Sequence, residues 1–542
     1  MKLTGAQILT EGLLREGVDH IFGYAGATIC PAVDALKDTP AIGYTLVRTE
    51  QNAGHMASGY ARVTGKVGVC MVTSGPGATN LITGIATAYL DSIPMVAITG
   101  QVPSHLLGRD IFQEVDITGA CSAFSKHTYL VKDAAKLPQI IKEAFYIAST
   151  GRPGPVLIDI PIDIQNQVVD VEFPDKVNIR GYNPSVRGNE KQIANVVRAI
   201  SEARQPVIVA GGGVFLADAV PELVRFAEWT KIPVVTTMMG LSLLPTDHPL
   251  NMGMIGSHGT RVANRALAKS DLLIMIGTRV ADRAIVSPSE IQRRMPSIHI
   301  DVDPAEIGKN IHPELPLVGD ARVILRQLME KEITLDHGDW LAQQQSARAE
   351  ELAREEPYRT DSVSPGRLMK HLGQRLNRDA AVCVDVGQNQ IWACRHLWLN
   401  GSRFLTSGGL GTMGYSLPAA VGVKVGQPDR QTVVVCGDGS FQMSMNELSA
   451  LAAKKLDIKI VLIRNGVLGL VNQIQHTDKY HGPFGVELAG SPDFAAVAAA
   501  YGIPSITVHS DAEAEAALDG FLSMEGPCLL IADVSADIRT ED

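Results

Sequence analysis

The sequence predicts an α/β protein of three doubly wound parallel-sheet domains. Short apolar runs alternate with helical patterns along nearly the whole chain, which is typical of parallel sheets covered by helices on both faces. The chain has 542 residues, too many for one ordinary hydrophobic core. Two polar, irregular stretches divide the alternation into three blocks, for which we expect the bounds 1–167, 189–335 and 360–542.

The elements expected in each block follow from its apolar runs. In the first block we predict strands at 67–72, 95–99 and 156–160. In the second we predict strands at 206–210, 233–237, 272–276 and 297–301 and a helix at 221–230. In the third we predict strands at 381–384, 432–436 and 458–463 and a helix at about 445–455. Segments 168–188 and 331–357 are expected to be connectors, the second of them helical or loose.

Composition argues against several classes of protein. Apolar residues make up 45% of the chain and charged residues 20%, as in a well-packed soluble protein. The net charge is −10 and no Lys/Arg run stands out, which argues against a nucleic-acid partner. No apolar run reaches the roughly 18 residues of a membrane span, and no signal or transit pattern opens the chain. Seven scattered cysteines without a CxxC pair indicate reduced thiols, so we expect a cytoplasmic protein.

The most informative motif is the Gly-Asp-Gly-Ser turn at 437–440, followed by Asn465. One predicted strand ends at this turn, a helical pattern follows, and the next predicted strand ends just before Asn465. This is one βαβ unit, whose right-handed crossover brings Asp438 and Asn465 to the carboxyl ends of near-neighbour strands. A carboxylate and an amide oxygen there suit Mg²⁺, and the two glycines let a diphosphate approach the backbone. For Gly-Asp-Gly alone, a simple tight turn is an equal alternative.

With this spacing the chain resembles the thiamine-diphosphate-dependent enzymes, in which Gly-Asp-Gly is followed after some two dozen residues by Asn. The resemblance implies that Mg²⁺ on the cofactor's diphosphate is held by Asp438, Asn465 and the carbonyl of Val467. It covers nearly the whole chain and is closest to the acetolactate synthase (acetohydroxyacid synthase) branch of the family, through segments such as 98–103 and 151–159. The three domains would then be a pyrimidine-binding, a central FAD-binding and a diphosphate-binding domain.

The third block contains two further loops that the resemblance assigns to thiamine diphosphate. The loop after the strand at 381–384 would meet the diphosphate. The literal G-x-G-x-x-G within 409–414 is weak evidence for a dinucleotide site when it stands alone, and in the family it lies along the aminopyrimidine. The implied contacts in this block are Val386, Gly387, Gln388, Asn389, Gly411, Met413, Gly437, Gly439, Ser440 and Leu468, besides the metal ligands.

Glu50 ends a predicted strand at 45–50, and a helical pattern continues from 51. On position alone this carboxylate merely complements a helix N-terminus. The resemblance implies more: Glu50 would hydrogen-bond the cofactor's aminopyrimidine and so promote loss of the thiazolium proton, which creates the nucleophile and electron sink. Because family members hold the cofactor between the first domain of one subunit and the third of another, a homodimer or a dimer of dimers is implied.

Glycine-rich turns and charged residues follow several strands of the second block. Gly211, Gly212 and Gly213 follow a strand directly and would let phosphates approach backbone N–H groups, while Arg279 could pair with a diphosphate. Taken singly, each feature is better explained by a turn or a surface ion pair. The resemblance implies a structural FAD at this position, bound by these residues and by Arg152, Thr237, Met238, His258, Gly277, Arg283, Asp301, Val302 and Asp320.

The resemblance implies a carboligase that decarboxylates pyruvate and transfers the hydroxyethyl unit to a second 2-oxo acid, giving 2-acetolactate and CO₂. Gln113 and Lys126 are the further catalytic candidates, although a salt-bridged surface lysine is the alternative for Lys126. A 2-oxo-acid decarboxylase, another acyl transferase, or a catalytically silent nucleotide-binding protein are the competing hypotheses. The implied pathway is branched-chain amino acid biosynthesis, and a small regulatory subunit would be a further partner.

Three departures from the family pattern bear on the acceptor. The family's early Gly-Tyr-Pro-Gly-Gly-Ala stands here as Gly-Tyr-Ala-Gly-Ala-Thr at 23–28, so Ala27 places a Cβ toward the reacting carbon. Ile474 stands where branched-chain biosynthetic members have a tryptophan that favours 2-oxobutyrate. The sequence ends soon after Val534, without the family's longer tail. The donor chemistry is therefore expected to follow the family, while the acceptor stays open.

Overall fold

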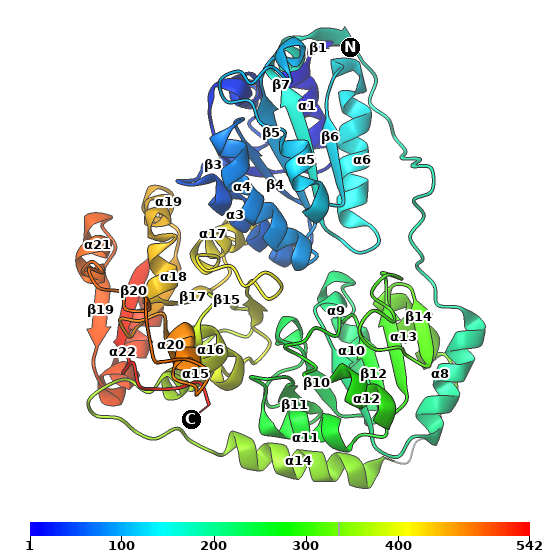
Figure 1. Ribbon diagram of the computed structural model, residues 1–542, viewed down its shortest axis with the longest axis vertical. Coiled ribbons are helices and arrows are strands. Elements are labelled where there is room, and N and C mark those ends of the chain that lie inside the picture. Colours follow the sequence, from blue (N-terminus) through cyan, green and yellow to red (C-terminus); the bar gives the residue numbers. More distant parts are fainter. Residues whose placement is uncertain (334–336, 542) are drawn as a thin grey trace.

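The computed structural model describes residues 1–333 and 337–541. The described chain forms three six-stranded sheets, all of them parallel throughout, and one short antiparallel pair. Figure 1 shows them as three lobes, with the N-terminal domain at the top, the C-terminal domain at the lower left and the central domain at the lower right. The expected fold class, three α/β domains with parallel sheets, is confirmed.

The N-terminal sheet has the strand order β3-β2-β4-β5-β7-β6. Its strands are β2 (His20–Tyr24), β3 (Gly43–Leu46), β4 (Gly68–Val72), β5 (Met95–Gln101), β6 (His127–Leu130) and β7 (Pro155–Pro161). Its helices are α1 (Gly5–Arg15), α2 (Cys30–Lys37), α3 (Glu50–Thr64), α4 (Pro76–Leu90), α5 (Ile117–Cys121), α6 (Leu137–Ser149) and α7 (Ile162–Asn166). Every residue of β4, β5 and β7 is buried, because helices cover both faces of the sheet.

The central sheet has the strand order β11-β10-β9-β12-β13-β14. Its strands are β9 (Pro206–Ala210), β10 (Val234–Thr236), β11 (Asn251–Met254), β12 (Leu272–Ile276), β13 (Ser297–Asp301) and β14 (Leu315–Val318). Its helices are α8 (Glu190–Glu202), α9 (Gly213–Leu216), α10 (Val220–Thr230), α11 (Arg261–Lys269), α12 (Pro288–Arg294) and α13 (Ala321–Met329). Helix α14 (Gly338–Leu352) then runs along the base of the molecule toward the C-terminal domain (Figure 1).

The C-terminal sheet has the strand order β16-β15-β17-β18-β20-β19. Its strands are β15 (Ala381–Val384), β16 (Arg403–Leu405), β17 (Thr432–Gly437), β18 (Ile458–Arg464), β19 (Ser505–Val508) and β20 (Cys528–Asp533). Its helices are α15 (Pro365–Arg375), α16 (Gln388–His396), α17 (Ser416–Gly426), α18 (Asp438–Gln442), α19 (Leu448–Lys454), α20 (Gly469–Gln475), α21 (Phe494–Ala500) and α22 (Asp511–Ser523).

Most predicted strands agree with the structure, and four of them agree to the residue: β9, β12, β13 and β15. One prediction is wrong. The strand expected at 45–50 ends at Leu46, and Glu50 is the first residue of α3. The cause lies outside the sheet, since the N–H of Arg48 donates to the carboxylate of Glu447 in the C-terminal domain at 2.8 Å and therefore leaves the strand ladder.

The two expected connectors differ from each other. Segment 168–188 begins with a short strand, β8 (Val168–Asp170), which pairs antiparallel with β1 (Lys2–Thr4), and then runs down the side of the molecule to α8 (Figure 1). The second connector, 331–357, contains α14, as the helical alternative predicts. Residues 334–336, and with them the expected end of the second block at 335, lie outside the described residues.

The N-terminal and C-terminal domains share one hydrophobic core. Helix α3 packs against α17, and a single cluster of buried apolar side chains extends through both domains. A buried ion pair reinforces the junction: Arg62 Nη2 lies 2.7 Å from Asp91 Oδ2, and Asp91 Oδ1 accepts the N–H of Gly409 at 2.7 Å. The loop that contains Gly409 is therefore held from the N-terminal domain.

Candidate functional site

The Gly-Asp-Gly turn lies at the carboxyl end of β17, and Asn465 follows the neighbouring strand β18. The buried carboxylate of Asp438 accepts the N–H groups of Asn465 at 3.1 Å, Gly466 at 2.7 Å and Gly439 at 3.0 Å. Burial raises the pKa of Asp438, and these three donors oppose that rise. The structure thus brings together the two residues that the spacing predicts to meet.

Oxygen atoms suited to a hard cation gather at this turn. The Asn465 amide is fixed on both sides, because its Oδ1 accepts the N–H of Val467 at 3.2 Å and its Nδ2 donates to Gln388 Oε1 at 3.1 Å. In the described chain no cluster of three or more His, Cys, Asp or Glu side chains is placed to hold a metal. Mg²⁺ needs no such cluster, since it keeps few protein ligands and takes phosphate and water oxygens as well. The carboxylate of Asp438 would supply a negatively charged oxygen ligand.

Predicted cofactor residues surround the same turn closely. A Cβ added at Gly437 would lie 3.1 Å from Asn389 Oδ1, and one at Gly439 would lie 2.9 Å from Leu468 and 3.5 Å from Met413. The backbone of the turn is closed by Ser440, whose hydroxyl contacts both N–H and C=O of Gly437 at 3.1 Å. Only glycine leaves the turn this narrow space, as a backbone that approaches a ligand closely requires.

Asp385 is a site residue that the sequence reasoning missed. Its fully buried carboxylate accepts N–H groups of Val386 at 2.9 Å, Gly414 at 2.8 Å and Ser416 at 2.9 Å, and the Ser416 hydroxyl at 2.6 Å. Burial raises the pKa of Asp385 against these donors. The side chain joins the loop 386–389 to the loop 411–414. The available signal was a carboxylate directly after an apolar strand.

Backbone conformation fixes both of these loops. Gly387 and Gly411 have φ values of 143° and 72°, in the region that glycine adopts readily. Asn389 Nδ2 donates to the carbonyl of Asp385 at 2.7 Å and so closes the first loop. The 409–414 glycines lie in the loop between β16 and α17.

Glu50 and Gln113 lie near each other at the first turn of α4. Glu50 Oε2 accepts an N–H of Asn80 at 3.0 Å, and a Cβ added at Gly77 would lie 3.3 Å from its Oε1. A Cβ added at Gly75 would lie 2.9 Å from the Cβ of Gln113. These residues follow the carboxyl ends of the N-terminal strands, the edge at which open α/β sheets bind ligands.

Glu50 is not bonded directly to the Gly-Asp-Gly turn or to Asn465 in the described part of the chain. The nearby contact between the two domains is made by Glu447, whose Oε1 accepts from the N–H of Arg48 and from Asn52 Nδ2 at 2.9 Å.

Lys126 is placed differently from the prediction. Its ammonium donates to the carbonyl of Ile147, to the carbonyl of Thr150 at 2.7 Å and to the hydroxyl of Tyr182 at 3.0 Å. Burial lowers the pKa of Lys126 to about 8. Three acceptors use all the N–H bonds of an ammonium, so in this structure Lys126 anchors the end of α6 and has none left for a substrate carboxylate. The alternative of a salt-bridged surface lysine does not describe it either, because its three partners are two carbonyls and a hydroxyl.

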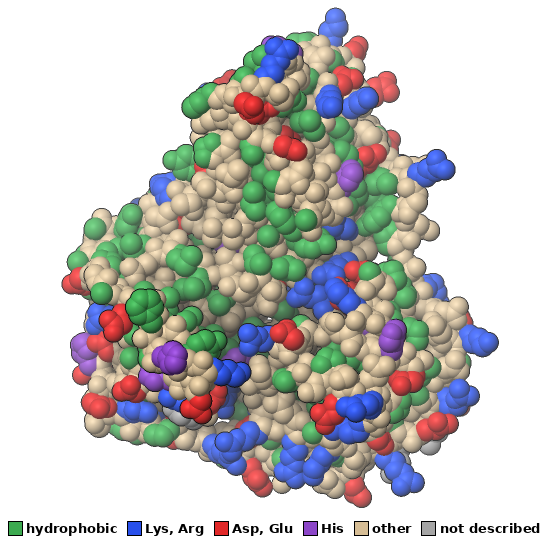
Figure 2. All heavy atoms as spheres, in the orientation of Figure 1, with side chains coloured by type: hydrophobic (Ala, Val, Ile, Leu, Met, Phe, Trp, Pro, Cys, Tyr) green, Lys and Arg blue, Asp and Glu red, His purple; other side chains and the backbone are tan. Residues whose placement is uncertain are grey.

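A cavity of about 1640 Å³ opens where the three domains meet. This exceeds the roughly 300–1,000 Å³ of most ligand pockets. Figure 2 shows Lys and Arg side chains gathered where the N-terminal and central lobes face each other. The cavity wall includes the predicted flavin residues Arg152, Gly212, Gly213, Thr237, Met238, His258, Gly277, Arg279, Arg283, Asp301, Val302 and Asp320. Gly211 lies behind this wall, because a Cβ there would meet the carbonyl of Gly277 at 2.3 Å.

The glycines of this wall pack two turns against each other. A Cβ added at Gly213 would lie 2.7 Å from the Cα of Gly277, and Gly277 itself has a φ of 56°. A Cβ added at Gly212 would lie 3.0 Å from the Cβ of Met239. The turns after β9 and β12 therefore come close enough to leave backbone, not side chains, on the cavity surface.

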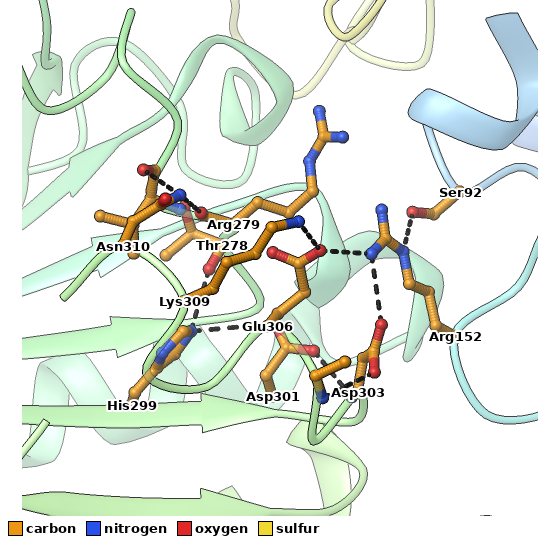
Figure 3. Close-up of polar contacts among 12 residues, drawn as sticks. Ser92, Arg152, Thr278, Arg279, His299, Asp301, Asp303, Glu306, Lys309 and Asn310 are labelled. Atoms are coloured by element: carbon orange, nitrogen blue, oxygen red, sulfur yellow. Dashed lines mark hydrogen bonds and ion pairs between the residues drawn. The ribbon is translucent and has the colours of Figure 1, made fainter. Parts of the chain in front are cut away.

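Figure 3 shows the polar end of the cavity, where Arg152 crosses from the N-terminal to the central domain. Its Nη1 lies 3.2 Å from Asp303 and 2.6 Å from Glu306, and its Nε donates to Ser92 at 2.9 Å. Burial raises the pKa of the neighbouring Asp301 to about 6. This network fixes the relative position of the two domains at the cavity.

Arg279 differs from Arg152 because its charge has no protein partner. In Figure 3 its guanidinium points away from Glu306 and Lys309, and it makes no hydrogen bond or ion pair among the described residues. Burial lowers the pKa of Arg279, and the charge of Arg152 adds to this effect. A desolvated cation that faces a cavity without a partner favours an anionic ligand.

The remaining predicted flavin residues are fixed by their backbones. Ser257 donates its N–H to the carbonyl of Arg283 at 3.1 Å, and burial followed by the Arg283 charge lowers the pKa of His258. Thr237 donates its N–H to Ala210 at 3.0 Å. Asp320 caps α13 by accepting the N–H of Val323 at 3.0 Å.

The two residues that depart from the family pattern lie on short helices. Ala27 opens the 3₁₀ turn η1 (Ala27–Ile29) after β2. Ile474 lies on α20, is 47% exposed and lines the large cavity.

No helix of the described chain is both long and apolar enough to cross a membrane.

Three family models match the chain. They are described as the thiamine pyrophosphate enzyme N-terminal TPP binding domain, central domain and C-terminal TPP binding domain, and they match residues 3–120, 193–328 and 385–532. Each match falls on one of the three parallel sheets.

Curated proteins are similar to this chain along most of its length. It is 43% identical to an acetolactate synthase of Arthrospira platensis, over 99% of this chain and 95% of that protein. It is 47% identical to the acetolactate synthase large subunit of Corynebacterium glutamicum, over 88% and 77% respectively. It is 42% identical to a probable acetolactate synthase large subunit of Methanocaldococcus jannaschii, over 97% and 91%.

Proposed function

The chain belongs to the thiamine pyrophosphate enzymes, and from this we propose that it is a carboligase of the acetolactate synthase type. It would decarboxylate pyruvate and join the two-carbon unit to a second 2-oxo acid, giving 2-acetolactate and CO₂. One observation carries the proposal: Asp438 and Asn465 meet at adjacent strand ends in a chain 43% identical to an acetolactate synthase over nearly its full length.

The residues of the Gly-Asp-Gly turn fit a magnesium diphosphate. Asp438, Asn465 and the carbonyl of Val467 would hold Mg²⁺, while the loops at 386–389 and 437–440 present backbone N–H groups to the phosphates. Bound thiamine diphosphate would supply a nucleophilic carbon that also accepts the electrons released by decarboxylation. Glu50, oriented by Asn80, would exchange a proton with the aminopyrimidine ring, and Gln113 beside it would contact the substrate.

The family resemblance supports assembly of the site from two copies. In a homodimer the N-terminal domain of one subunit would cover the C-terminal domain of the other, so that acid and metal ligands face one cofactor. A dimer of dimers and a small regulatory subunit are compatible extensions. The predicted role in branched-chain amino acid biosynthesis in the cytoplasm follows from the same assignment.

The large cavity fits FAD. Its volume exceeds an ordinary ligand pocket, and the unpartnered Arg279 supplies a cation for a diphosphate. Asp301 and Asp320 at strand ends offer carboxylates to hydroxyl groups of a ribose or ribityl chain. Because carboligation involves no net oxidation or reduction, the flavin would serve the structure of the site.

The proposal is tested by assay of the purified protein with pyruvate, thiamine diphosphate and Mg²⁺. Acid treatment of the product should give acetoin, which a colour assay detects, and the protein should show flavin absorbance.

Glu50→Gln should lower turnover at least about a hundredfold, because this is the usual contribution of a positioned acid–base group. Its flavin absorbance and melting temperature should be unchanged. CO₂ release without acetoin would establish a decarboxylase instead, and near-wild-type turnover of Glu50→Gln would refute the role of Glu50.

A further inference from the structure

Arg403 places a second unpartnered cation in the wall of the large cavity. It lies on β16, the edge strand of the C-terminal sheet, and its guanidinium covers the ring of Phe215 on α9 of the central domain, with Cζ 3.2 Å from the ring centroid. Among the described residues its side chain makes no hydrogen bond or ion pair, and its Nη1 is buried without a partner. Stacking uses only the face of a guanidinium, so the donors in its plane stay available.

Two further arginines, Arg62 and Arg430, line the same cavity as Arg403 and come from other parts of the chain. Burial lowers the pKa of Arg403 to about 9, and the charges of Arg62 and Arg430 add to this effect. Arg62 is paired with Asp91, but its Nε has no partner in the described chain. Arg430 donates to the carbonyl of Asp379 and to Gln427 Oε1 at 2.6 Å, and neither acceptor is charged. The Asp379 carboxylate attracts Arg430 electrostatically but forms no ion pair with it among the described residues. All three arginines line the cavity, and Asp91 is the one carboxylate within it that pairs with any of them in the described structure.

An excess of positive charge of this kind is costly in a partly dry cavity unless an anion is bound. A single carboxylate would balance only one guanidinium. A phosphoanhydride carries at least two charges and several acceptor oxygens, which match the planar donors of two or three arginines. The donors to such an anion would be the arginines of α3, β16 and the turn after α17. No donor is assigned to the N-terminus of the short helix α9.

We propose that Arg62, Arg403 and Arg430 form a binding site for a phosphoanhydride group in the cavity between the three domains. The group comes from one of two sources: the diphosphate of the flavin, or a separate nucleotide-type polyphosphate. The flavin source rests on the proposed function, whereas the separate polyphosphate does not. No residue of this site belongs to the thiamine diphosphate machinery described above.

The test uses inorganic pyrophosphate as the probe and protein saturated with thiamine diphosphate and Mg²⁺, so that the Gly-Asp-Gly turn is already occupied. Calorimetry and melting temperature are measured with and without added FAD. Arg403→Met keeps the packing on Phe215 but removes the charge, and it should weaken pyrophosphate binding at least about tenfold. Without pyrophosphate or FAD its melting temperature should equal or exceed that of the wild type, because an unpaired, partly buried charge is removed.

Arg322→Met is the matched control. Arg322 lines the same cavity, but its guanidinium donates to the carbonyl of Ala217 at 2.9 and 2.8 Å and pairs with Asp218 at 3.0 Å. Its loss should change pyrophosphate affinity by less than about twofold. Arg430→Met is a second variant of the proposed site and should weaken binding in the same direction as Arg403→Met.

The outcomes separate the two sources. Pyrophosphate that binds only flavin-free protein and competes with FAD identifies the flavin diphosphate as the anion. Pyrophosphate that also binds flavin-saturated protein, with loss in Arg403→Met, identifies a separate polyphosphate. Wild-type protein that binds no pyrophosphate in either state, or Arg403→Met and Arg430→Met that bind it as tightly as Arg322→Met, would overturn the proposal. The acetoin assay tests the proposed function independently of all these results.

Discussion

Asp159 is a buried residue that supports the loop carrying Gln113. Its side chain on β7 accepts from the Thr99 hydroxyl at 2.6 Å and from Gln101 Nε2 at 2.9 Å, and Gln101 Nε2 also donates to the carbonyl of Val115 at 2.8 Å. Val115 lies two residues after Gln113 in the same loop. Gln101 is therefore turned inward, where it supports the loop that carries Gln113.

Asp159→Asn should remove a pH-dependent loss of stability. Burial raises the pKa of Asp159 from 3.8 to about 7. Because the folded state then holds this proton over a range in which the unfolded state has lost it, stability falls as pH rises from about 4 to about 7 and is level above that. Asparagine keeps an acceptor for Gln101 and a partner for Thr99 without titrating. The melting temperature of Asp159→Asn relative to wild type should rise across this window, and a constant difference would show that Asp159 is ionised throughout.

Among the elements, α20 carries the residue most relevant to the acceptor. The helix is held by the C-terminal segment, since Gln473 exchanges hydrogen bonds of 3.1 Å with the hydroxyl and N–H of Thr540. Ile474 is the next residue, 47% exposed on the wall of the cavity. The helix thus presents Ile474 from a fixed position, with space beside it for a larger side chain.

Ile474→Trp should raise the preference for 2-oxobutyrate over pyruvate as acceptor, because a flat ring gives the extra methyl group an apolar surface worth about 1 kcal/mol, or several-fold in selectivity. Competition assays with both acids measure the ratio of products. Val471→Trp is the control, since Val471 lies on the same helix and is 44% exposed but does not line the cavity. Equal selectivity in Ile474→Trp and wild type would show that another residue sets the acceptor.

At this scale the sequence was a good guide to the central strands and a poorer one to the edge strand β3. Central strands such as β9 and β12 are buried on both faces, so continuous apolar runs mark their bounds. The strand before α3 ends at Leu46, earlier than the expected end at 50, because Arg48 bonds to Glu447, which is 399 residues away in the chain. A contact at that separation leaves no local pattern. The two residues of the βαβ unit, Asp438 and Asn465, needed only local topology, and their meeting was predictable.

For the whole molecule, the residues that no local pattern could place are those whose partners are distant in the sequence. Lys126 was assigned to substrate, but its partners lie on α6 and at Tyr182 in the following connector. Arg62 and Asp91 pair beneath the loop of Gly409 in another domain. Arg403 reaches Phe215 across a domain boundary. Each depends on the packing of whole sheets, so the cavity and its charges become visible only in three dimensions.

Assembly into a homodimer is the prediction that concerns the molecule as a whole. Phe112, beside Gln113, is 88% exposed, and Phe484, in the segment after α20, is 89% exposed. Exposed aromatic side chains next to the two halves of the candidate site are expected to be covered by a second copy, with about 1.5–3 kcal/mol gained for each one buried.

Phe112→Ser should therefore weaken the dimer at least about tenfold, and turnover should fall with dilution as the site comes apart. Val286→Ser is the control, because Val286 is 67% exposed on the central domain, away from Glu50 and Asp438. Sedimentation equilibrium and activity measured over the same range of concentration give the two readouts together. A Phe112→Ser protein that stays dimeric and active on dilution would place the subunit interface elsewhere. A wild-type monomer with full activity would show that one chain completes the site alone.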